Sequence, residues 1–311
     1  MNKQFHGRFI NMRKYLLDNI YLHSDSRDPL TININKYYIH THPVVSMNRS
    51  NYKRHNKTAS IEFEGSQEDS ILYSGGRYGT KYKTRKTKLI EDILIIGSIF
   101  TGWNWGLTSR RKYNYYPLQP ISNLSQLHIS ETCEVESHFK SALNRLLDKN
   151  WQIQYENGFH LRMLFNQANI NHMESRFLSN MIIWEWLYPH EKNPNGATPK
   201  DESLDLKKII SYILTKHWPA QYKRQDKNNI FHALRNQLAH SGTLPINRPH
   251  KYVDNWMKQI PWDDPNGTDL QSYLKFFNIL TQVVVLKTID INADYLIQSQ
   301  LNNYLSKGSI D

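Results

Sequence analysis

The spacing of apolar residues constrains the second part of the chain more than any other feature of the sequence. From residue 131 onward, segments with apolar residues three or four positions apart alternate with short polar breaks. That period predicts amphipathic helices, so we expect an all-helical domain over residues 131–311. The predicted helices cover residues 135–147, 158–170, 172–189, 203–218, 228–241 and 269–289.

The first 130 residues have a different texture, which predicts a β-rich domain with one helix. Residues 30–40 (LTININKYYIH) alternate apolar and polar side chains, as a half-buried strand does. Residues 58–65 and 70–76 flank a polar turn and predict a hairpin. Residues 86–100 are rich in Ile, which also suits a buried strand, but their apolar spacing favours a helix. The predicted fold class is α+β, with a mainly β domain at 1–130 before the helical domain.

The charge of the chain is concentrated in its first part. Residues 1–130 hold 19 Lys and Arg against 9 Asp and Glu, a net of +10, whereas residues 131–311 hold 20 against 19, a net of +1. This asymmetry suggests a polyanionic partner for the N-terminal domain, most simply a nucleic acid. The alternative is a basic surface without a specific partner.

Two basic segments of the N-terminal domain are interleaved with tyrosines, at residues 77–88 (RYGTKYKTRKTK) and 109–116 (SRRKYNYY). Basic groups attract the phosphate backbone of RNA, and tyrosines stack on bases. A solvated loop with core tyrosines is the alternative at both places. A third basic group lies just before the predicted helix at 228. The candidate RNA-binding residues are Arg77, Lys81, Lys83, Arg85, Lys86, Arg110, Arg111, Lys223, Arg224 and Lys227.

Composition and motifs exclude several other classes of protein. The single Cys133 gives no intrachain disulfide framework, and the first 15 residues lack the apolar stretch of a signal peptide. With no apolar run long enough for a membrane span, we expect a cytoplasmic protein without a membrane partner. The sequence has no Walker spacing, no HExxH and no cysteine cluster, so we expect no cofactor and no metal.

Two histidines, His40 and His42, alternate on one side of a strand-like segment without further obvious metal ligands. Core or surface roles are expected for those two and for His160, His172, His217, His232 and Trp184.

The predicted helix at 228–241 carries the residues with the clearest chemical potential. Arg235 and Asn236 are followed by His240, and Gly242 supplies a left-handed stop that ends the helix there. The spacing alone is weak evidence, because Arg49 and His55 give a similar pair in a polar segment. An ordinary helix C-terminus, where a protonated histidine interacts favourably with the helix dipole, is the alternative interpretation. The opposite face of the helix is apolar: Ile230, Phe231, Leu234 and Leu238.

The segment ALRNQLAHSG resembles the Arg-Asn-x-x-x-His signature of the HEPN superfamily. Residues 174–190 resemble the long helix that precedes the motif in its ApeA-like, abortive-infection branch, and residues 269–289 resemble the closing helix. The resemblance covers about residues 133–295 and implies an all-α HEPN helical bundle. It further implies a metal-independent endoribonuclease that works as a homodimer through the helical domain. An antiphage or toxin role would add a phage-derived trigger or a regulatory protein as a partner.

The three motif residues suit RNA cleavage by the 2′-hydroxyl, with a 2′,3′-cyclic phosphate as product. His240 exchanges protons near neutral pH, Arg235 binds phosphate, and Asn236 orients the histidine or donates to phosphate. Five residues at about 100° each put Arg235 and His240 about 140° apart on the helix, so two helices related by a two-fold axis would form a better site. A tRNA or another structured RNA is the expected substrate. The alternative function is a non-catalytic HEPN dimer that binds RNA or a partner protein.

Overall fold

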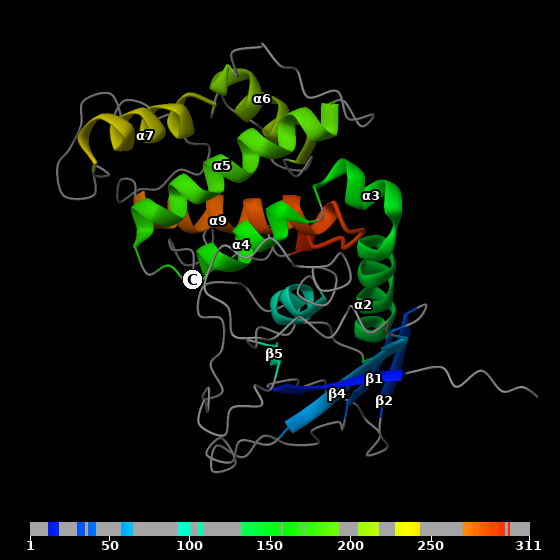
Figure 1. The fold of residues 1–311 in the computed structure, drawn as a ribbon. Helices are drawn as coiled ribbons and strands as arrows, with labels where there is room; N and C mark the ends of the chain where they lie inside the picture. Colours follow the sequence, from blue (N-terminus) through cyan, green and yellow to red (C-terminus); the bar gives the residue numbers. More distant parts are fainter. Residues whose placement is uncertain are drawn as a thin grey trace, which may run out of the picture. The chain divides into compact units, whose positions relative to one another are not determined.

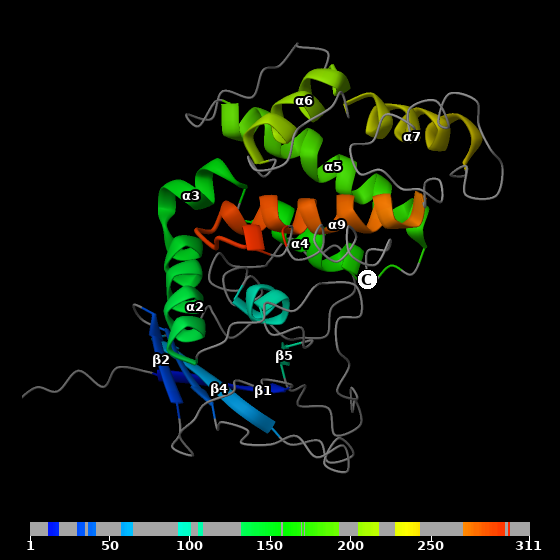
Figure 2. The ribbon, with the colours of Figure 1, turned by 180° about the vertical axis from the view of Figure 1, so that it is seen from behind.

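The computed structural model of the chain has an α+β architecture, drawn in Figures 1 and 2. Contacts divide the chain into two compact units, Met1–Pro120 with His128–Leu147, and Ile121–Leu127 with Asp148–Asp311. The first unit holds the sheet and the second holds only helices among its described elements. The structure describes residues 12–18, 30–34, 37–41, 57–64, 93–100, 105–107, 132–156, 158–168, 170, 172–192, 205–217, 228–242, 270–295 and 298.

The described sheet of the first unit is antiparallel and has the strand order β2-β3-β4-β1-β5. Ile32, Ile39 and Ile61 are directly opposite one another on three adjacent strands and are buried, which makes them the centre of its inner face. The five strands are β1 (Met12–Asp18), β2 (Leu30–Ile34), β3 (Tyr37–Thr41), β4 (Lys57–Glu64) and β5 (Gly106–Leu107).

Two details of the predicted β pattern differ from the structure. The single alternating segment at residues 30–40 is divided into β2 and β3, which pair with each other in antiparallel register. The apolar positions change from even numbers (30, 32 and 34) to odd numbers (37 and 39) between the two strands, and this change of phase is the local sign of the division. The segment at residues 58–65 does form a strand, but β4 pairs with β1 on one side and β3 on the other. Its predicted partner, residues 70–76, lies outside the described residues.

Helices complete the first unit. Residues 93–100 are helical, as their spacing favoured, and α2 (Thr132–Leu147) lies against β2. The ring of Phe139 on α2 contacts Phe100 and Trp105, at centroid distances of 5.7 and 5.4 Å. The unit that contains the sheet therefore includes α2, whereas the predicted helical domain begins at residue 131; that domain boundary stays a prediction.

The second unit is built around α5, the longest described helix. In both views α6 and α7 lie on one side of α5, and α4 and α9 lie on the other (Figures 1 and 2). The spacing of apolar residues predicted all of these helices except the short α3. Their bounds are α3 (Lys149–Gln154), α4 (Phe159–Ala168), α5 (Met173–Lys192), α6 (Leu206–His217), α7 (Asn228–Ser241) and α9 (Leu270–Lys287).

Three aromatic rings join α5, α7 and α9. Phe231 of α7 lies 4.5 Å from Phe277 of α9 and 6.3 Å from Trp184 of α5, measured between ring centroids. Trp184 is completely buried, and its indole N–H donates to the Thr281 hydroxyl at 2.9 Å. Trp184, for which a core or a surface role was expected, is thus a core residue, and α7 is attached to the unit by a tightly packed aromatic contact.

The end of α5 corrects the predicted stop at Pro189. The helix continues through this proline to Lys192, and polar contacts hold the additional residues. The side-chain amide of Gln154 donates to the His190 carbonyl at 3.0 Å.

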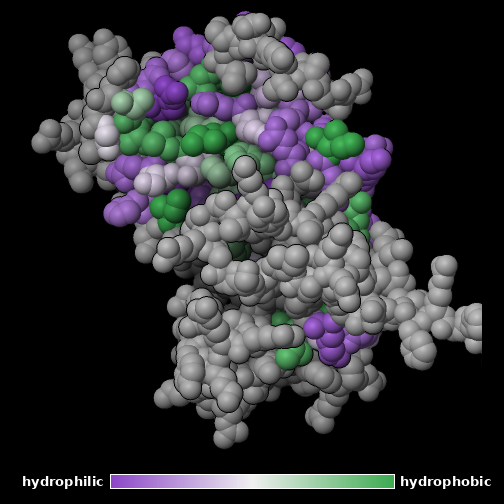
Figure 3. Space-filling view, in the orientation of Figure 1, coloured by the Kyte–Doolittle hydropathy of each residue, from purple (hydrophilic) through white to green (hydrophobic). Residues whose placement is uncertain are grey.

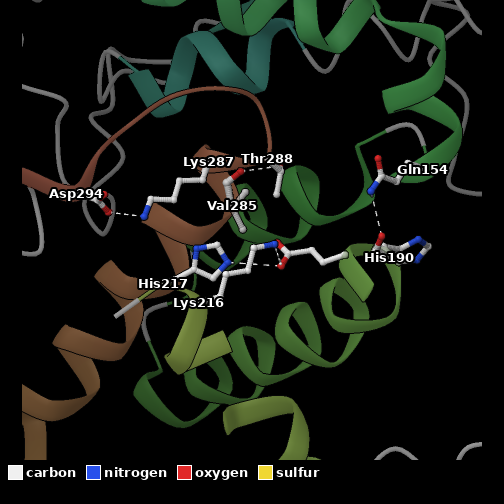
Figure 4. A network of polar contacts seen from close by, with 9 residues as sticks. Gln154, His190, Lys216, His217, Val285, Lys287, Thr288 and Asp294 are labelled. Atoms are coloured by element: carbon white, nitrogen blue, oxygen red, sulfur yellow. Dashed lines mark hydrogen bonds and ion pairs between the residues drawn. The ribbon is translucent and has the colours of Figure 1, made fainter. Parts of the chain in front are cut away.

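The carboxylate of Glu191 forms a second set of contacts at this end of α5. It is 2.6 Å from Lys216 and 3.6 Å from His217, both at the end of α6 (Figure 4). Only 3% of the Glu191 side chain is exposed, whereas Lys216 is 46% exposed, so a buried carboxylate is paired with a lysine at the surface of the unit.

Candidate functional site

Helix α7 presents one apolar face and one polar face, as its sequence predicted. Phe231, Leu234 and Leu238 are buried, and their spacing of three and four residues places them on one side of the helix. The helix ends after Ser241, where Gly242 has a φ of +70° and its N–H donates to the Leu238 carbonyl at 2.9 Å. This is the left-handed glycine stop expected at that position.

The polar face of α7 brings Arg235 and Asn236 together with a residue that the motif did not include. His232, Arg235 and Asn236 are all partly exposed and lie within one helical turn. The Nδ2 atom of Asn236 is 3.3 Å from the Nε2 atom of His232. The side chain of His240 lies outside the described residues, but its backbone is helical. His240 therefore follows His232 by eight helical residues.

Glu185 of α5 is a second residue that the sequence did not single out. Burial raises the pKa of its carboxyl group, and the positive charge of Arg235 partly counters that effect. A carboxylate in a partly apolar environment is costly unless a cation compensates it. Its signal in the sequence is the one charged residue in the otherwise apolar stretch at 181–188 (MIIWEWLY), but only the packing of α5 against α7 brings it near Arg235.

The start of α6 contributes two charged groups near His232. The Asp205 carboxylate accepts from the backbone N–H of Lys207 at 3.0 Å and so caps α6. Burial lowers the pKa of His232, and the positive charges of Lys207 and Arg235 lower it further, whereas Asp205 opposes them. The ring is therefore neutral at pH 7, when one ring nitrogen has a free lone pair. Lys207 is exposed and adds a cation on this side of the helices.

The predicted RNA-binding residues lie outside the described residues, so the structure places none of them relative to α7. They are Lys223, Arg224 and Lys227, together with Arg77, Lys81, Lys83, Arg85, Lys86, Arg110 and Arg111. Within the described part of the chain, no group of three or more His, Cys, Asp or Glu could hold a metal ion. His40, the described member of the pair at residues 40 and 42, instead contacts Thr31 at 3.0 Å and Glu62 at 3.5 Å.

Chemically, the site offers a permanent cation, a half-buried carboxyl group, a neutral imidazole and an amide on two adjoining helices. A guanidinium and a lysine attract phosphate, and an amide and a neutral imidazole can each donate and accept hydrogen bonds.

None of the described helices is long and apolar enough to cross a membrane. Comparisons with protein-family models, curated proteins and solved structures find no match to this chain.

Proposed function

We propose that the chain is a metal-independent endoribonuclease of the HEPN type, with a β-rich N-terminal domain at 1–130 and a HEPN bundle at 131–311. The observation that carries the proposal is the polar face of α7. Asn236 is partly exposed there, on the side away from the buried Phe231 and Leu238. Arg235, at the edge of the buried side, is partly exposed as well, and the helix ends just after His240. A motif needed only for packing would be directed into the core, whereas the described polar members are accessible to a substrate.

The proposed reaction uses the RNA 2′-hydroxyl as the nucleophile. Its proton is removed, its oxygen attacks the adjacent phosphorus, and the bond to the 5′-oxygen breaks to leave a 2′,3′-cyclic phosphate and a 5′-hydroxyl. His240 exchanges the proton, and Arg235 compensates the charge that grows on the phosphate. Glu185 would steady the guanidinium of Arg235, since the two groups interact across α5 and α7.

A homodimer is part of the proposal, and α5 has a surface suited to it. Leu178 and Ile182 are exposed by 37% and 46% and lie seven and three residues before Glu185, on the same side of the helix. Figure 3 shows patches of hydrophobic residues among hydrophilic ones on the surface of the helical unit. A two-fold contact through this stripe would place two copies of the site beside each other. Exposed apolar side chains next to a polar site are typical of interaction surfaces.

The biological setting that we propose is antiphage defence or a toxin system in the cytoplasm, with tRNA or another structured RNA as the target. A phage-derived trigger or a regulatory protein would then control the enzyme. The basic N-terminal domain would contribute RNA contacts through the ten predicted basic residues.

The test is cleavage of labelled tRNA and total RNA in EDTA by the full chain. We expect His240→Ala to lower the rate by about 10²–10⁴-fold, the contribution of a general acid–base residue, and Arg235→Ala to lower it strongly as well. The control is His172→Ala, an exposed histidine of the same unit. Products should carry a cyclic phosphate, detected by resistance to phosphatase until acid opens the ring.

Retained cleavage by the His240→Ala variant would refute the catalytic assignment. If the wild type binds RNA or a second copy but does not cut, the non-catalytic dimer is the correct function. Analytical ultracentrifugation of the Ile182→Lys variant tests the dimer separately, because a charge placed in the stripe should dissociate it.

A further inference from the structure

His232 has a contact that gives it a role beyond that of a surface histidine. It lies one helical turn before Asn236, and its Nε2 atom is 3.3 Å from the Nδ2 atom of that amide. Residues four apart on a helix are neighbours on its surface. The two side chains therefore interact on the exposed face of α7, beside Arg235.

The chemistry of the two groups fixes the sense of this hydrogen bond. The Nδ2 atom of an amide only donates, so the Nε2 atom of His232 accepts with its lone pair. That requires a neutral ring with its proton on Nδ1. Burial favours this state, and the positive charges of Lys207 and Arg235 add to that effect; together they outweigh Asp205, whose negative charge opposes it.

The helix geometry places His232 too far from His240 for both side chains to act directly on the same phosphate. Eight residues at about 1.5 Å each put the two positions about 12 Å apart along the axis. A general acid or base must come within about 3 Å of the proton that it transfers. Asn236 lies midway between the two histidines, four residues from each, so the contact between His232 and the amide is the route by which His232 influences the site.

We propose that His232 is a positioning residue that holds the Asn236 amide with Oδ1 as its free acceptor, ready to orient the catalytic histidine or the attacking hydroxyl. This inference rests on the proposed ribonuclease function. Protonation of His232 turns Nε2 into a donor, so the amide must rotate and give its Oδ1 to the ring. The acceptor is then lost from the site, and activity falls as the pH is lowered through the titration of His232.

The kinetic test compares two substitutions in the full chain. Phe at position 232 (His232→Phe) keeps a ring but removes the acceptor, whereas His232→Gln keeps an acceptor that does not titrate. We expect His232→Phe to lower kcat by about 3–10-fold at pH 7.5, the effect of one neutral hydrogen bond, with KM changed less than kcat. His232→Gln should restore most of kcat and remove the decline on the acid side that belongs to His232.

The control is His172→Phe, which changes an exposed histidine and should leave the pH profile unaltered. A wild-type kcat and pH profile for His232→Phe would overturn the inference, and so would an equal loss in both His232 variants. Circular dichroism at the assay pH verifies that each variant keeps the helical content of the wild type.

A readout without RNA separates this inference from the proposed function. In the ¹⁵N-labelled chain, the ring nitrogens of His232 should show a protonated Nδ1 and a bare Nε2 at pH 7. The side-chain amide signal of Asn236 should shift as His232 titrates and should shift again in His232→Phe. If the amide signal of Asn236 responds neither to the titration of His232 nor to the His232→Phe substitution, the inference is wrong whether or not the chain cleaves RNA. If the amide responds but the wild type does not cleave, the positioning contact stands and the ribonuclease proposal fails.

Discussion

The buried His160 predicts a specific dependence of stability on pH. No part of this side chain is exposed, and its ring lies 5.0 Å from the ring of Trp186 with the planes at 16°. Its Nε2 atom is 2.7 Å from the Thr288 hydroxyl, which itself donates to the Val285 carbonyl at 2.7 Å. The hydroxyl proton is thus already used, so Nε2–H donates and Nδ1 carries the lone pair.

Protonation of His160 would place a charge on a nitrogen without a partner. The Nδ1 atom is buried and has no hydrogen bond. Burial lowers the pKa of His160 to about 3, and the charges of His190 and Arg162 contribute to the shift. In the unfolded chain the ring regains a pKa near 6.5. The unfolded state therefore binds the proton first, and the free energy of unfolding falls as the pH decreases from about 6.5 to about 3.

The magnitude follows from the two pKa values. A difference of about 3.5, at 1.36 kcal/mol for each pH unit, corresponds to about 5 kcal/mol lost by pH 3. About 2 kcal/mol of that loss is expected at pH 5, since the slope is 1.36 kcal/mol per pH unit below 6.5. Total stabilities of domains are about 5–15 kcal/mol, so acid alone should unfold or loosen the helical unit.

The assay is urea denaturation of the wild type and His160→Phe between pH 8 and pH 4, followed by tryptophan fluorescence. Phe keeps a ring against Trp186 without a titrating nitrogen, so we expect a stability within about 1.5 kcal/mol of the wild type at pH 8. At lower pH the variant should become relatively more stable by the amounts above. Carboxyl groups titrate in both proteins and cancel in the difference. A difference that stays constant from pH 8 to pH 4 would refute the reasoning, and His172→Phe serves as the matched exposed control.

Three further perturbations test the packing. Phe231→Ala removes a buried ring of α7 and should lower the free energy of unfolding by about 3–5 kcal/mol in urea melts, whereas Ile153→Ala, at a side chain exposed by 65%, should change it by less than about 0.5 kcal/mol. Gly97→Ala should cost about 1–3 kcal/mol by overpacking in the same assay, because a Cβ there would lie 2.2 Å from the Trp105 ring. Glu191→Gln should cost on the order of 1 kcal/mol at pH 7, since it breaks an ion pair between a buried carboxylate and a lysine that is 46% exposed and screened by solvent. Burial opposes ionisation of Glu191, but His217 and Lys216 outweigh it and lower its pKa, so this contribution is present above about pH 4.5 and is lost as the pH falls further; a Glu191→Gln effect that does not decrease below pH 4.5 would contradict the assignment.

Local periodicity was enough to predict α7 and its end. The apolar residues at 231, 234 and 238 determine one face, and Gly242 alone determines the stop, since both signals lie within fifteen residues. The end of α5 was not predictable in the same way. Pro189 is a local stop signal, and the contacts that overrule it come from Gln154 and from residues of α6. Such long-range contacts leave no trace in the local pattern.

The residues of the candidate site also divide into those that local sequence predicts and those that depend on long-range packing. Arg235 and Asn236 could be selected from sequence because a motif includes them. Glu185 could not, because its relation to Arg235 depends on how α5 packs against α7, fifty positions away along the chain. His232 is local to the helix, yet a histidine on a helix face is usually a surface residue, and only its contact with Asn236 in the structure distinguishes it.

Glu185 also links the site to the stability of the helical unit. It is flanked by Trp184, which packs on Phe277 at 4.7 Å, and by Trp186, which stacks on His160. One short segment of α5 therefore contacts the aromatic core and the acid-sensitive histidine, and its carboxyl group is influenced by the charge of Arg235. A change that loosens either tryptophan must also move Glu185 relative to Arg235. Substitutions of Phe231 or His160 that leave the chain folded should then alter activity through α5, although neither residue would touch RNA, and this effect should follow the loss of stability rather than the pH profile of His232.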